Sequence, residues 1–261
     1  MLDKSTIRTE NKMKISIITV CYNSEDTIRT CIESISDQSY QDLEHIIIDG
    51  GSTDATLEIV RSYTAENIKV FSAADDGIYD AMNKGFYKAV GDVVAYLNSD
   101  DYYANAGVIQ AVMLKFTASE VDYVYGDIDY INDAFVKVRS WVVGEIESGV
   151  LRSQQIPHPA FFCRRSVIER LSIPFDSSLK ICGDLKQQLY LLNRHKIRGC
   201  YINQVLAIMR VGGASTSGLG ASLLGWKEAV SAYNEVEGRG GFLYVIRKVL
   251  IKVSGLLPRR V

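Results

Sequence analysis

Short apolar runs alternate with longer stretches of helical spacing over residues 14–97. The apolar runs predict strands at 14–20, 43–48, 68–71 and 93–97, and the stretches between them predict helices at 24–37, 53–63 and 79–90. Strands and helices that alternate in this way are typical of βαβ units with right-handed crossovers. The pattern therefore predicts an α/β fold with a mostly parallel central sheet flanked by helices.

The pattern changes after about residue 120. Strands are expected at 121–125, at 128–131 and within 136–143, and helices return at 165–171, 185–194 and 223–236. No proline-rich linker, repeat or low-complexity segment divides the chain. We therefore expect one domain whose first half binds a nucleotide-like ligand and whose second half completes the site.

The C-terminal segment has an amphipathic and basic pattern. Apolar residues recur at helical spacing, and they are Phe242, Val245, Ile246, Val249, Leu250, Val253, Leu256 and Leu257. Arg247, Lys248 and Lys252 fall off that face, and Arg259–Arg260 follow it. A helix of this kind either lies on an anionic membrane surface or packs on the domain with its lysines in water. The pattern alone leaves both interpretations open.

Composition and charge exclude some classes of protein. The 261 residues are 47% hydrophobic and 23% charged, which is an ordinary globular composition. A net charge of −2 and a pI near 6.0 give no general attraction to nucleic acid. Residues 1–12 are polar and lack the apolar core of a signal peptide, so we expect a flexible tail there. Five scattered cysteines without zinc-site spacing predict free thiols in a reducing cytoplasm.

Three polar clusters follow predicted strands, at 21–23, 49–54 and 98–101. Ligands of parallel sheets bind beyond the carboxyl ends of the strands, so these clusters are expected at one edge. The segment 49–54 reads Asp-Gly-Gly-Ser-Thr-Asp, which is consistent with a turn and a helix cap. That interpretation gives Asp49 no task, whereas a carboxylate here suits a hydrogen bond to a base edge or ribose hydroxyl.

The adjacent carboxylates Asp100 and Asp101 follow a run of apolar residues that predicts a buried strand. Like charges at such a position repel one another and are best tolerated beside a cation or water. No cluster of cysteine and histidine competes for a metal. The pair therefore predicts a cation site with oxygen ligands.

Two later features have competing interpretations. In the segment 75–85, a helix cap and a buried apolar face leave Asp80, Asn83 and Lys84 unexplained, and the lysine suits a phosphate. Asp184 precedes a helical pattern, and from the residues alone an N-cap is the favoured interpretation. His158 lies between two prolines and is most simply a structural loop residue, and the glycine-rich 212–216 is a flexible loop.

Taken in order, several segments resemble the family-2 glycosyltransferases, which are inverting enzymes with the GT-A fold. The matching segments are 16–23, 48–54, 76–85, 97–101, 158–162 and 183–184, and the resemblance covers roughly residues 14 to 216. The run Gly-Ile-Tyr-Asp-Ala-Met-Asn-Lys-Gly at 77–85 and the later 212–216 resemble the branch that builds bacterial exopolysaccharide, colanic acid-like or O-antigen chains.

The resemblance implies a role for each matching residue. It implies that Thr19, Tyr22, Asn23, Asp49, Asp75, Lys84, Asn98, Ser99 and Asp100 bind the nucleotide-sugar. Within that set, Asp49 pairs with the base, and Asp75 and Lys84 lie near the ribose or phosphates. Asp100, with Asp101 beside it, holds Mg²⁺ or Mn²⁺ against the diphosphate, and Asp184 becomes the general base in place of a plain cap.

One departure from the family pattern concerns the metal. The Asp-x-Asp motif reads Asn98-Ser99-Asp100 here, so one carboxylate is absent. We therefore expect Asp100 and the phosphates of the donor to hold the metal jointly.

The implied function is transfer of a sugar from a UDP-, dTDP- or GDP-sugar to a saccharide or lipid-linked acceptor. The implied organisation is a tail at 1–12, a GT-A domain at 13–216 and a helical extension at 217–261. Within the domain, 13–101 is the nucleotide-binding half and 102–216 the acceptor half. The expected location is the cytoplasm, peripheral on the inner face of the membrane if the last helix binds lipid.

Two alternatives remain. A non-catalytic sugar-nucleotide-binding protein is favoured only by Asn98. An NAD-dependent oxidoreductase is disfavoured because the Gly-x-Gly-x-x-Gly fingerprint is absent.

Overall fold

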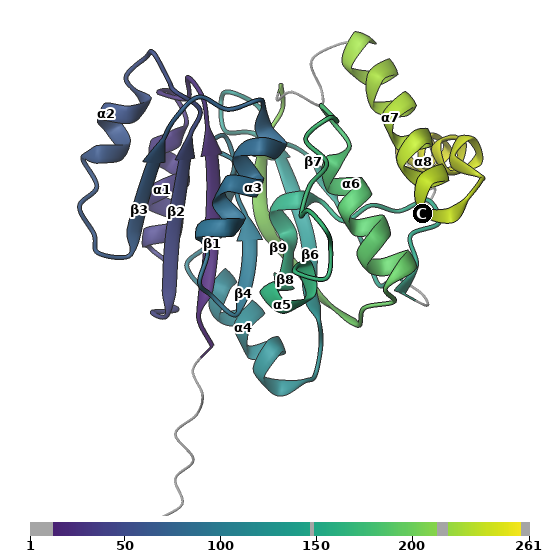
Figure 1. Cartoon of the computed structure of the whole chain (residues 1–261), viewed down its shortest axis with the longest axis horizontal. Coiled ribbons are helices and arrows are strands. Elements are labelled where there is room, and N and C mark those ends of the chain that lie inside the picture. The colour runs from purple at the N-terminus through teal and green to yellow at the C-terminus, as the bar shows by residue number, and fades with distance from the viewer. Residues whose placement is uncertain (1–12, 147–148, 213–218, 257–261) are drawn as a thin grey trace, which may run out of the picture.

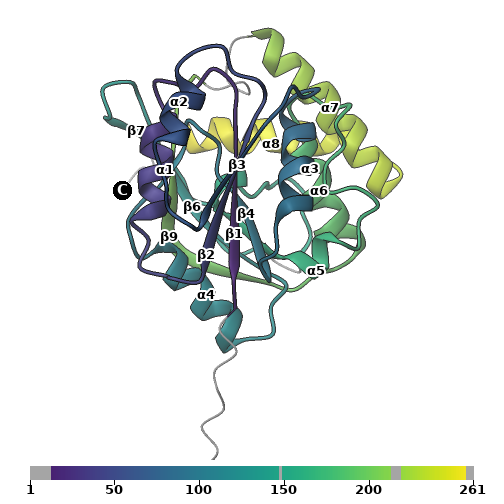
Figure 2. The ribbon, with the colours of Figure 1, turned by 60° about the vertical axis from the view of Figure 1, so that its left-hand side comes forward.

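A nine-stranded mixed sheet forms the centre of the molecule, with helices on both faces (Figures 1 and 2). The computed structural model describes residues 13–146, 149–212 and 219–256. The strand order is β3-β2-β1-β4-β8-β6-β9-β5, and β7 pairs with β6. The predicted α/β fold class is confirmed. The expected tail at 1–12 and the residues 213–216 and 259–260 lie outside the described residues.

The first half of the sheet is parallel, as the alternating pattern predicts. Its strands are β1 (Ile15–Cys21), β2 (Leu43–Asp49), β3 (Ile68–Ser72) and β4 (Val93–Tyr96). Cys21 is level with Asp49, and Asp49 is level with Ser72, so these strands end together at one edge. The polar segments that follow them are therefore delivered to the same edge of the sheet.

The second half of the sheet is mixed. It contains β5 (Tyr102–Tyr103), β6 (Tyr123–Ile131), β7 (Lys137–Trp141), β8 (Phe161–Arg164) and β9 (Gly199–Arg210). β8 is antiparallel to both β4 and β6, whereas β6 and β9 are parallel. The prediction of two strands at 121–125 and 128–131 was wrong, because β6 continues through Gly126 with only a shift in register against β9. A side chain at Gly126 would meet Leu206 at 2.7 Å.

Two helical layers cover the sheet. The helices are α1 (Ile28–Ser36), α2 (Thr56–Arg61), α3 (Ile78–Lys88), α4 (Val108–Ala118), α5 (Arg165–Ile168) and α6 (Gly183–Gln188). A π-helix at Leu189–Arg194 continues α6, and a short 3-10 turn spans His158–Ala160. Ile15 and Ile17 of β1 pack in the core beneath α1 and α4, and the alternate Ile18 and Val20 pack beneath α3 and α6.

Helices α7 (Leu219–Glu237) and α8 (Gly241–Leu256) pack beside α6 at the C-terminal end of the described chain (Figure 1). Tyr244 of α8 is buried and stacks on Tyr233 of α7, with ring centroids 4.7 Å apart. The outer side of α8 remains open, since Phe242 is 72% and Leu250 is 61% exposed. Within the described ranges, none of the helices combines the length and hydropathy needed to cross a bilayer.

Candidate active site

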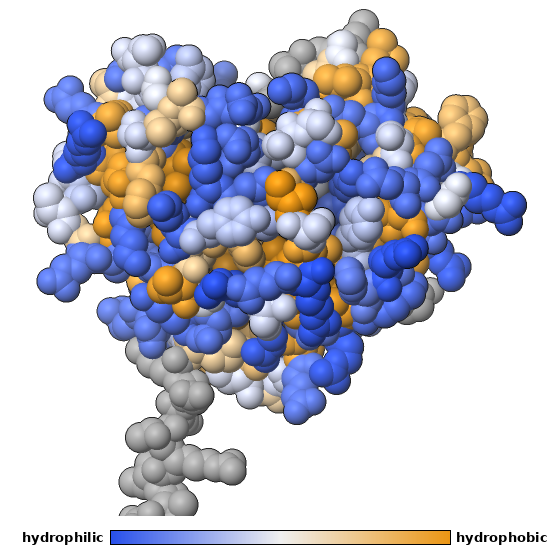
Figure 3. Space-filling model, viewed as in Figure 1, coloured by the Kyte–Doolittle hydropathy of each residue, from blue (hydrophilic) through white to orange (hydrophobic). Residues whose placement is uncertain are grey.

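The candidate site lies at the carboxyl ends of β1, β2 and β4, where the strand order reverses between β1 and β4. In Figure 3 the surface is notched at the top, between the part that carries α2 and the part that carries α7. The arrowheads of β1, β2 and β3 point toward that side in Figure 1. The polar segments that follow the strands therefore have room for a ligand beside them.

The Asp49 carboxylate at the end of β2 is fully buried within a hydrogen-bonded turn. It accepts from the Ser72 hydroxyl at 2.6 Å, from the Ser52 hydroxyl at 2.5 Å and from the Gly51 amide at 3.2 Å. Gly51 has a φ of +84°, a conformation that favours glycine. Both the turn interpretation and a binding role remain compatible with this geometry, because a ligand could replace the two serine hydroxyls.

The segment after β1 is fastened to that turn. Asn23, with a φ of +48°, accepts from the Thr53 amide at 2.9 Å and donates its own amide to the Ser52 hydroxyl at 2.9 Å. The ring of Tyr22, which lies in sequence between β1 and Asn23, is 62% exposed. The structure thus brings the first two predicted clusters together and presents an aromatic ring to solvent.

Thr19 is placed differently from the other residues expected at the nucleotide. Its side chain is fully buried on the α1 side of β1, where the hydroxyl lies 2.9 Å from His45 Nε2 and 3.6 Å from Cys31 Sγ. A group in that position supports the strand rather than contacting a ligand with its side chain.

Asp75 approaches the turn through a space that only glycine provides. A Cβ at Gly50 would lie 2.6 Å from Asp75 Oδ2, so the carboxylate fills the place of a side chain. Its other oxygen accepts from the Gly77 amide at 2.9 Å. Nearby, Lys84 pairs with Asp80 at 2.8 Å and donates to the Ala74 carbonyl at 3.0 Å. Lys84 therefore braces the loop that carries Asp75.

The segment after β4 carries oxygen atoms that have no partner. Ser99 hydrogen-bonds to Ser24 at 2.8 Å, which ties this segment to the one after β1. Among the residues that the structure describes, both carboxylate oxygens of Asp101 and the Asn98 Oδ1 are buried without a hydrogen-bond partner. Burial and the neighbouring charge of Asp100 raise the pKa of Asp101 well above its ordinary value. Burial also raises the pKa of Asp100, and the charge of Arg210 on β9 opposes both shifts.

These unpartnered oxygens suit a hard cation. Mg²⁺ and Mn²⁺ prefer carboxylate and carbonyl oxygens, and the charge of a cation would offset the cost of burying two carboxylates. In the part of the chain that the structure describes, no group of three His, Cys, Asp or Glu side chains is gathered to hold an ion. A metal at Asp100 and Asp101 would thus need further oxygen ligands from a donor or water.

Asp184 lies in the first turn of α6 and contacts two other parts of the chain. Its Oδ1 is 3.3 Å from the Tyr79 hydroxyl of α3, and its Oδ2 accepts from Gln155 Nε2 at 2.9 Å. The Gly183 backbone lies against the Tyr79 ring, where a Cβ would come within 2.8 Å. The loop of Asp75 leads directly into α3, so Asp184 belongs to the same neighbourhood as the segments that follow β1 and β2.

The N-cap interpretation of Asp184 is wrong. The cap position is Cys182, and it makes no side-chain cap hydrogen bond. Instead, the buried Glu228 carboxylate of α7 accepts from the amides of Lys180, Ile181 and Cys182, each at 2.9 Å. These three amides precede α6, so Glu228 fixes the segment that leads into the helix, and Asp184 in the first turn faces Tyr79 and Gln155.

Some residues of this neighbourhood were not expected from the sequence. Gln155 and Glu228 carry no local signal, because each acts on a residue far away in the chain. Arg210 follows the apolar end of β9, a strand that the pattern did not predict. His158 stacks on Tyr96 with centroids 5.1 Å apart, and burial lowers its pKa, which is compatible with its structural interpretation.

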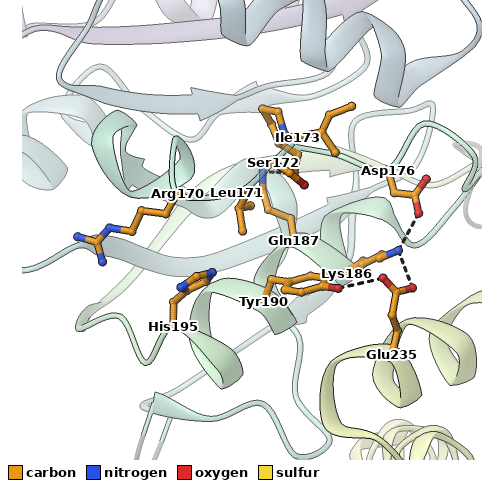
Figure 4. A pocket seen from close by; sticks show the side chains of 11 residues that line it. Arg170, Leu171, Ser172, Ile173, Asp176, Lys186, Gln187, Tyr190, His195 and Glu235 are labelled. Carbon is orange, nitrogen blue, oxygen red and sulfur yellow. Dashed lines mark hydrogen bonds and ion pairs between the residues drawn. The ribbon is translucent and has the colours of Figure 1, made fainter.

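A separate pocket of about 300 Å³ lies against α5, α6 and α7 (Figure 4). Arg170, Lys186 and His195 are among its lining residues, and none of the expected site residues lines it. Lys186 pairs with Asp176 and Glu235, both at 2.7 Å. The Lys186–Glu235 pair joins α6 to α7, and the Lys186–Asp176 pair joins α6 to the segment that precedes it.

Residues 16–165 match the model of the family described as Glycosyl transferase family 2. The chain belongs to this family. The matched region contains the segments around Asp49, Asp75 and Asp100, whereas Asp184 lies beyond it. All five cysteines of this family-2 chain are free thiols, as expected.

Relatives and solved structures agree with the family. An uncharacterized glycosyltransferase of Haemophilus influenzae is 41% identical over 98 residues, covering 36% of this chain and 39% of that protein. The putative glycosyltransferase EpsH of Bacillus subtilis is 34% identical over 112 residues, covering 42% of this chain and 32% of that protein. The chain thus matches about a third to two-fifths of the length of these relatives.

Two solved structures share the fold. S. aureus TarS in complex with UDP-GlcNAc has a TM-score of 0.66 at 20% identity, covering 84% of this chain and 65% of that one. The mannosyltransferase PcManGT from Pyrobaculum calidifontis, in complex with GDP-Man and Mn²⁺, has a TM-score of 0.65 at 14% identity, covering 96% of this chain and 77% of that one.

Proposed function

We propose that this family-2 chain transfers a sugar, with inversion, from a nucleotide-diphosphate donor to a hydroxyl of a saccharide or lipid-linked acceptor. The observation that carries the proposal is the contact of Asp184 with Tyr79 at 3.3 Å. Tyr79 belongs to α3, and the loop that leads into α3 carries Asp75. The Asp75 carboxylate in turn lies against Gly50, in the segment that follows β2. These contacts support a base beside a donor site.

In this mechanism Asp184 is the general base. Its carboxylate takes the proton of the acceptor hydroxyl while the acceptor oxygen bonds to the anomeric carbon. The bond between that carbon and the diphosphate oxygen breaks, and its electron pair leaves with the diphosphate. General-base assistance of this kind contributes roughly 10²–10⁴ in rate.

The donor would be held by the segments that follow β1, β2 and β4. Tyr22 offers an exposed aromatic face to a base, and the buried Asp49 carboxylate at the end of β2 would exchange its serine partners for the ligand. Asp75 and Lys84 would lie toward the ribose and phosphates, with Asn98 and Ser99 beside them. The nucleotide-sugars bound to TarS and PcManGT, UDP-GlcNAc and GDP-Man, make UDP- and GDP-sugars the first donors to try.

Asp100 and Asp101 would hold Mg²⁺ or Mn²⁺, with Asn98 Oδ1 as a further oxygen nearby. When bound, such an ion supplies Lewis-acid stabilisation of the negative charge that builds on the departing diphosphate. The protein residues contribute the anionic, partly buried position in which this charge compensation is strong.

For the acceptor, we propose a lipid-linked saccharide in bacterial surface or exopolysaccharide biosynthesis, reached from the cytoplasmic side of a membrane. The motif resemblance at 77–85 supports the pathway. Phe242, Ile246 and Leu250 form a line along the exposed side of α8, with Arg247 beside them. Apolar side chains flanked by a basic one fit the interface of an anionic bilayer.

A panel of UDP-, GDP- and dTDP-sugars and NAD, each with and without Mn²⁺, tests the donor class by thermal shift. We expect stabilisation by one nucleotide-sugar and a larger shift with Mn²⁺. Stabilisation by NAD alone would overturn the proposal. The NMR spectrum of the product then reports the anomeric configuration, and retention would contradict the assigned mechanism. A non-catalytic binding protein, which Asn98 alone favours, would show the shift without any product.

A further inference from the structure

Asp184 is connected to the C-terminal helix by one side chain. Gln155 donates Nε2 to Asp184 Oδ2 at 2.9 Å, and its Oε1 accepts from the Lys248 ammonium of α8. Gln155 lies between β7 and β8, and Lys248 lies far beyond the region matched by the family model. Three segments that are distant in sequence therefore meet at the candidate base.

The chemistry of the two neighbours fixes the orientation of the Gln155 amide. An ammonium only donates hydrogen bonds, and an ionised carboxylate only accepts them. The amide must therefore turn its oxygen to Lys248 and its NH₂ to Asp184. With Lys248 absent, the Gln155 oxygen loses this donor, and the side chain loses its anchor on α8.

The backbone around Gln155 is held by the helix that carries Asp184. One turn after Asp184, the buried Gln188 side chain accepts from the Ile156 amide at 3.1 Å and donates to the Ile156 carbonyl at 2.9 Å. Asn193 makes the same pair of bonds with Leu151, at 2.8 and 3.0 Å. The segment 151–156 is thereby docked on α6 and its π-helical continuation.

Helix α8 is fixed to the same segment from the other side. The Tyr244 hydroxyl, one turn before Lys248, donates to the Gln154 carbonyl at 2.9 Å. Tyr244 is buried and stacked on Tyr233, so α8 has little freedom to withdraw Lys248. The two partners of Gln155, Asp184 on α6 and Lys248 on α8, therefore lie on helices that packing holds in place.

We propose that Gln155 is a positioning residue for Asp184, and that Lys248 acts through Gln155 by anchoring its amide oxygen to α8. The inference rests on the proposed function, in which Asp184 is the base. It assigns a role to α8 in the chemical step, in addition to any contact that its outer side makes. The hydrogen bond from Gln155 orients the Asp184 carboxylate toward the acceptor hydroxyl. Loss of that bond therefore lowers kcat while the donor still binds.

The decisive variant is Gln155→Glu. A glutamate still accepts from Lys248 and keeps the link to α8, but it has no NH to donate to Asp184 and brings a like charge to it. We expect kcat to fall by about 10- to 100-fold, which is the range for losing one hydrogen bond to a charged group. The donor KM should remain within about twofold and the melting temperature near that of wild type.

Two variants at Lys248 and one control complete the test. Lys248→Met should lower kcat to a similar extent, Lys248→Arg should restore most of it because the donor is kept, and Arg239→Met, at an exposed position before α8, is the control. Turnover is measured with UDP-N-acetylglucosamine or GDP-mannose, whichever the thermal-shift panel selects, with Mn²⁺. A Gln155→Glu enzyme with normal kcat, or equal losses in Lys248→Met and Arg239→Met, would overturn the inference.

The inference and the proposed function fail in different ways. If wild type is active, Asp184→Asn is inactive and the Gln155 and Lys248 variants are normal, only the positioning role is wrong. If wild type shows no turnover of any donor, the proposed function fails and the role in kcat fails with it. The geometry is checked without turnover by the side-chain amide NMR signals of Gln155, which should shift in both Asp184→Asn and Lys248→Met.

Discussion

The Tyr79 hydroxyl lies 3.3 Å from the Asp184 carboxylate and donates to the Ile181 carbonyl at 2.7 Å. Burial and the charge of Asp184 raise the pKa of Tyr79 well above its ordinary value, so the hydroxyl stays protonated at any pH that enzymes use. The hydroxyl has one proton, which the Ile181 carbonyl and the Asp184 carboxylate share, with the shorter contact to Ile181. This contact fastens the start of α3 to the start of α6.

Replacing Tyr79 by phenylalanine should reduce turnover and leave donor binding intact. The substitution removes the hydroxyl and keeps the ring that packs on Gly183 and Phe175. We expect kcat to fall by about tenfold, the equivalent of one hydrogen bond of ~1–1.5 kcal/mol. Tyr190→Phe, which removes a hydroxyl bonded to Glu235 at 2.9 Å, is the control and should retain wild-type kcat. Equal kcat values for the two variants would contradict the role of Tyr79.

The pair Asp100 and Asp101 should behave differently from an exposed aspartate in metal binding. Asp100→Asn and Asp101→Asn each remove a charge from the proposed cation site, so the extra thermal shift given by Mn²⁺ with a nucleotide-sugar should be lost. Asp133→Asn, at an exposed position, should keep that shift. Calorimetric titration of Mn²⁺ in the presence of donor measures the change. A wild-type Mn²⁺ response in Asp100→Asn would exclude Asp100 as a ligand.

A methyl group at Gly50 should displace Asp75. The added Cβ would lie 2.6 Å from the Asp75 carboxylate oxygen, which must then move away from the turn. We expect Gly50→Ala to weaken nucleotide-sugar binding by about tenfold, because Asp75 is proposed to lie near the ribose or phosphates and ~1.4 kcal/mol corresponds to that factor. Gly220→Ala is the matched control, since nothing lies within 4 Å of its added Cβ. Equal donor affinities in both variants would place Asp75 outside the donor site.

His45 should give the protein a measurable loss of stability in mild acid. Burial lowers the pKa of His45 to about 3, from an ordinary value of 6.5. Between these two values the unfolded chain binds a proton that the folded protein does not, so the free energy of unfolding falls as the pH falls. The slope from one such group approaches about 1.4 kcal/mol per pH unit.

The stability difference between wild type and His45→Gln isolates this effect. Urea unfolding at pH 7, 6 and 5 should show the free energy of unfolding of wild type falling more steeply than that of the variant, whatever the offset at pH 7. Parallel pH dependence of the two proteins would mean that His45 titrates normally in the folded state.

The exposed side of α8 should determine binding to lipid. Phe242→Ser with Leu250→Ser removes two side chains that are 72% and 61% exposed, so folding should be little affected. We expect less protein to co-sediment with vesicles that contain anionic lipid, while turnover of a soluble acceptor is unchanged. Leu114→Ser on α4 is the control for a general change in surface hydropathy. Equal sedimentation of all three proteins would reject the membrane proposal.

The parts of the fold that follow local periodicity were predicted well. Strands β1 to β4 and helices α1 to α3 each have a regular apolar pattern and lie next to one another in both sequence and space. Helix α4 was missed because it is apolar around most of its circumference, which hides the helical period. β9 was missed because exposed polar residues, Asn203 and Gln204, interrupt it where its register shifts.

The site was predictable where a residue follows a strand and unpredictable where partners meet by packing. Asp49 and Asp100 were placed from their positions after apolar runs. Asp184 looked like a cap because its place before a helical pattern is a local signal, whereas its contacts with Tyr79 and Gln155 come from distant segments. Gln155 had no signal for the same reason, because its two partners come from α6 and α8.

The position of β4 bears on how the chain folds as it is synthesised. β4 ends at Tyr96 and is fully buried between β1 and β8, but β8 begins only at Phe161. Until the ribosome has delivered that later strand, residues 93–96 present an apolar edge with open amides and carbonyls to the solvent. A fragment that stops near residue 101 would therefore associate through this edge, and the first four strands would depend for their solubility on a strand encoded well downstream of them.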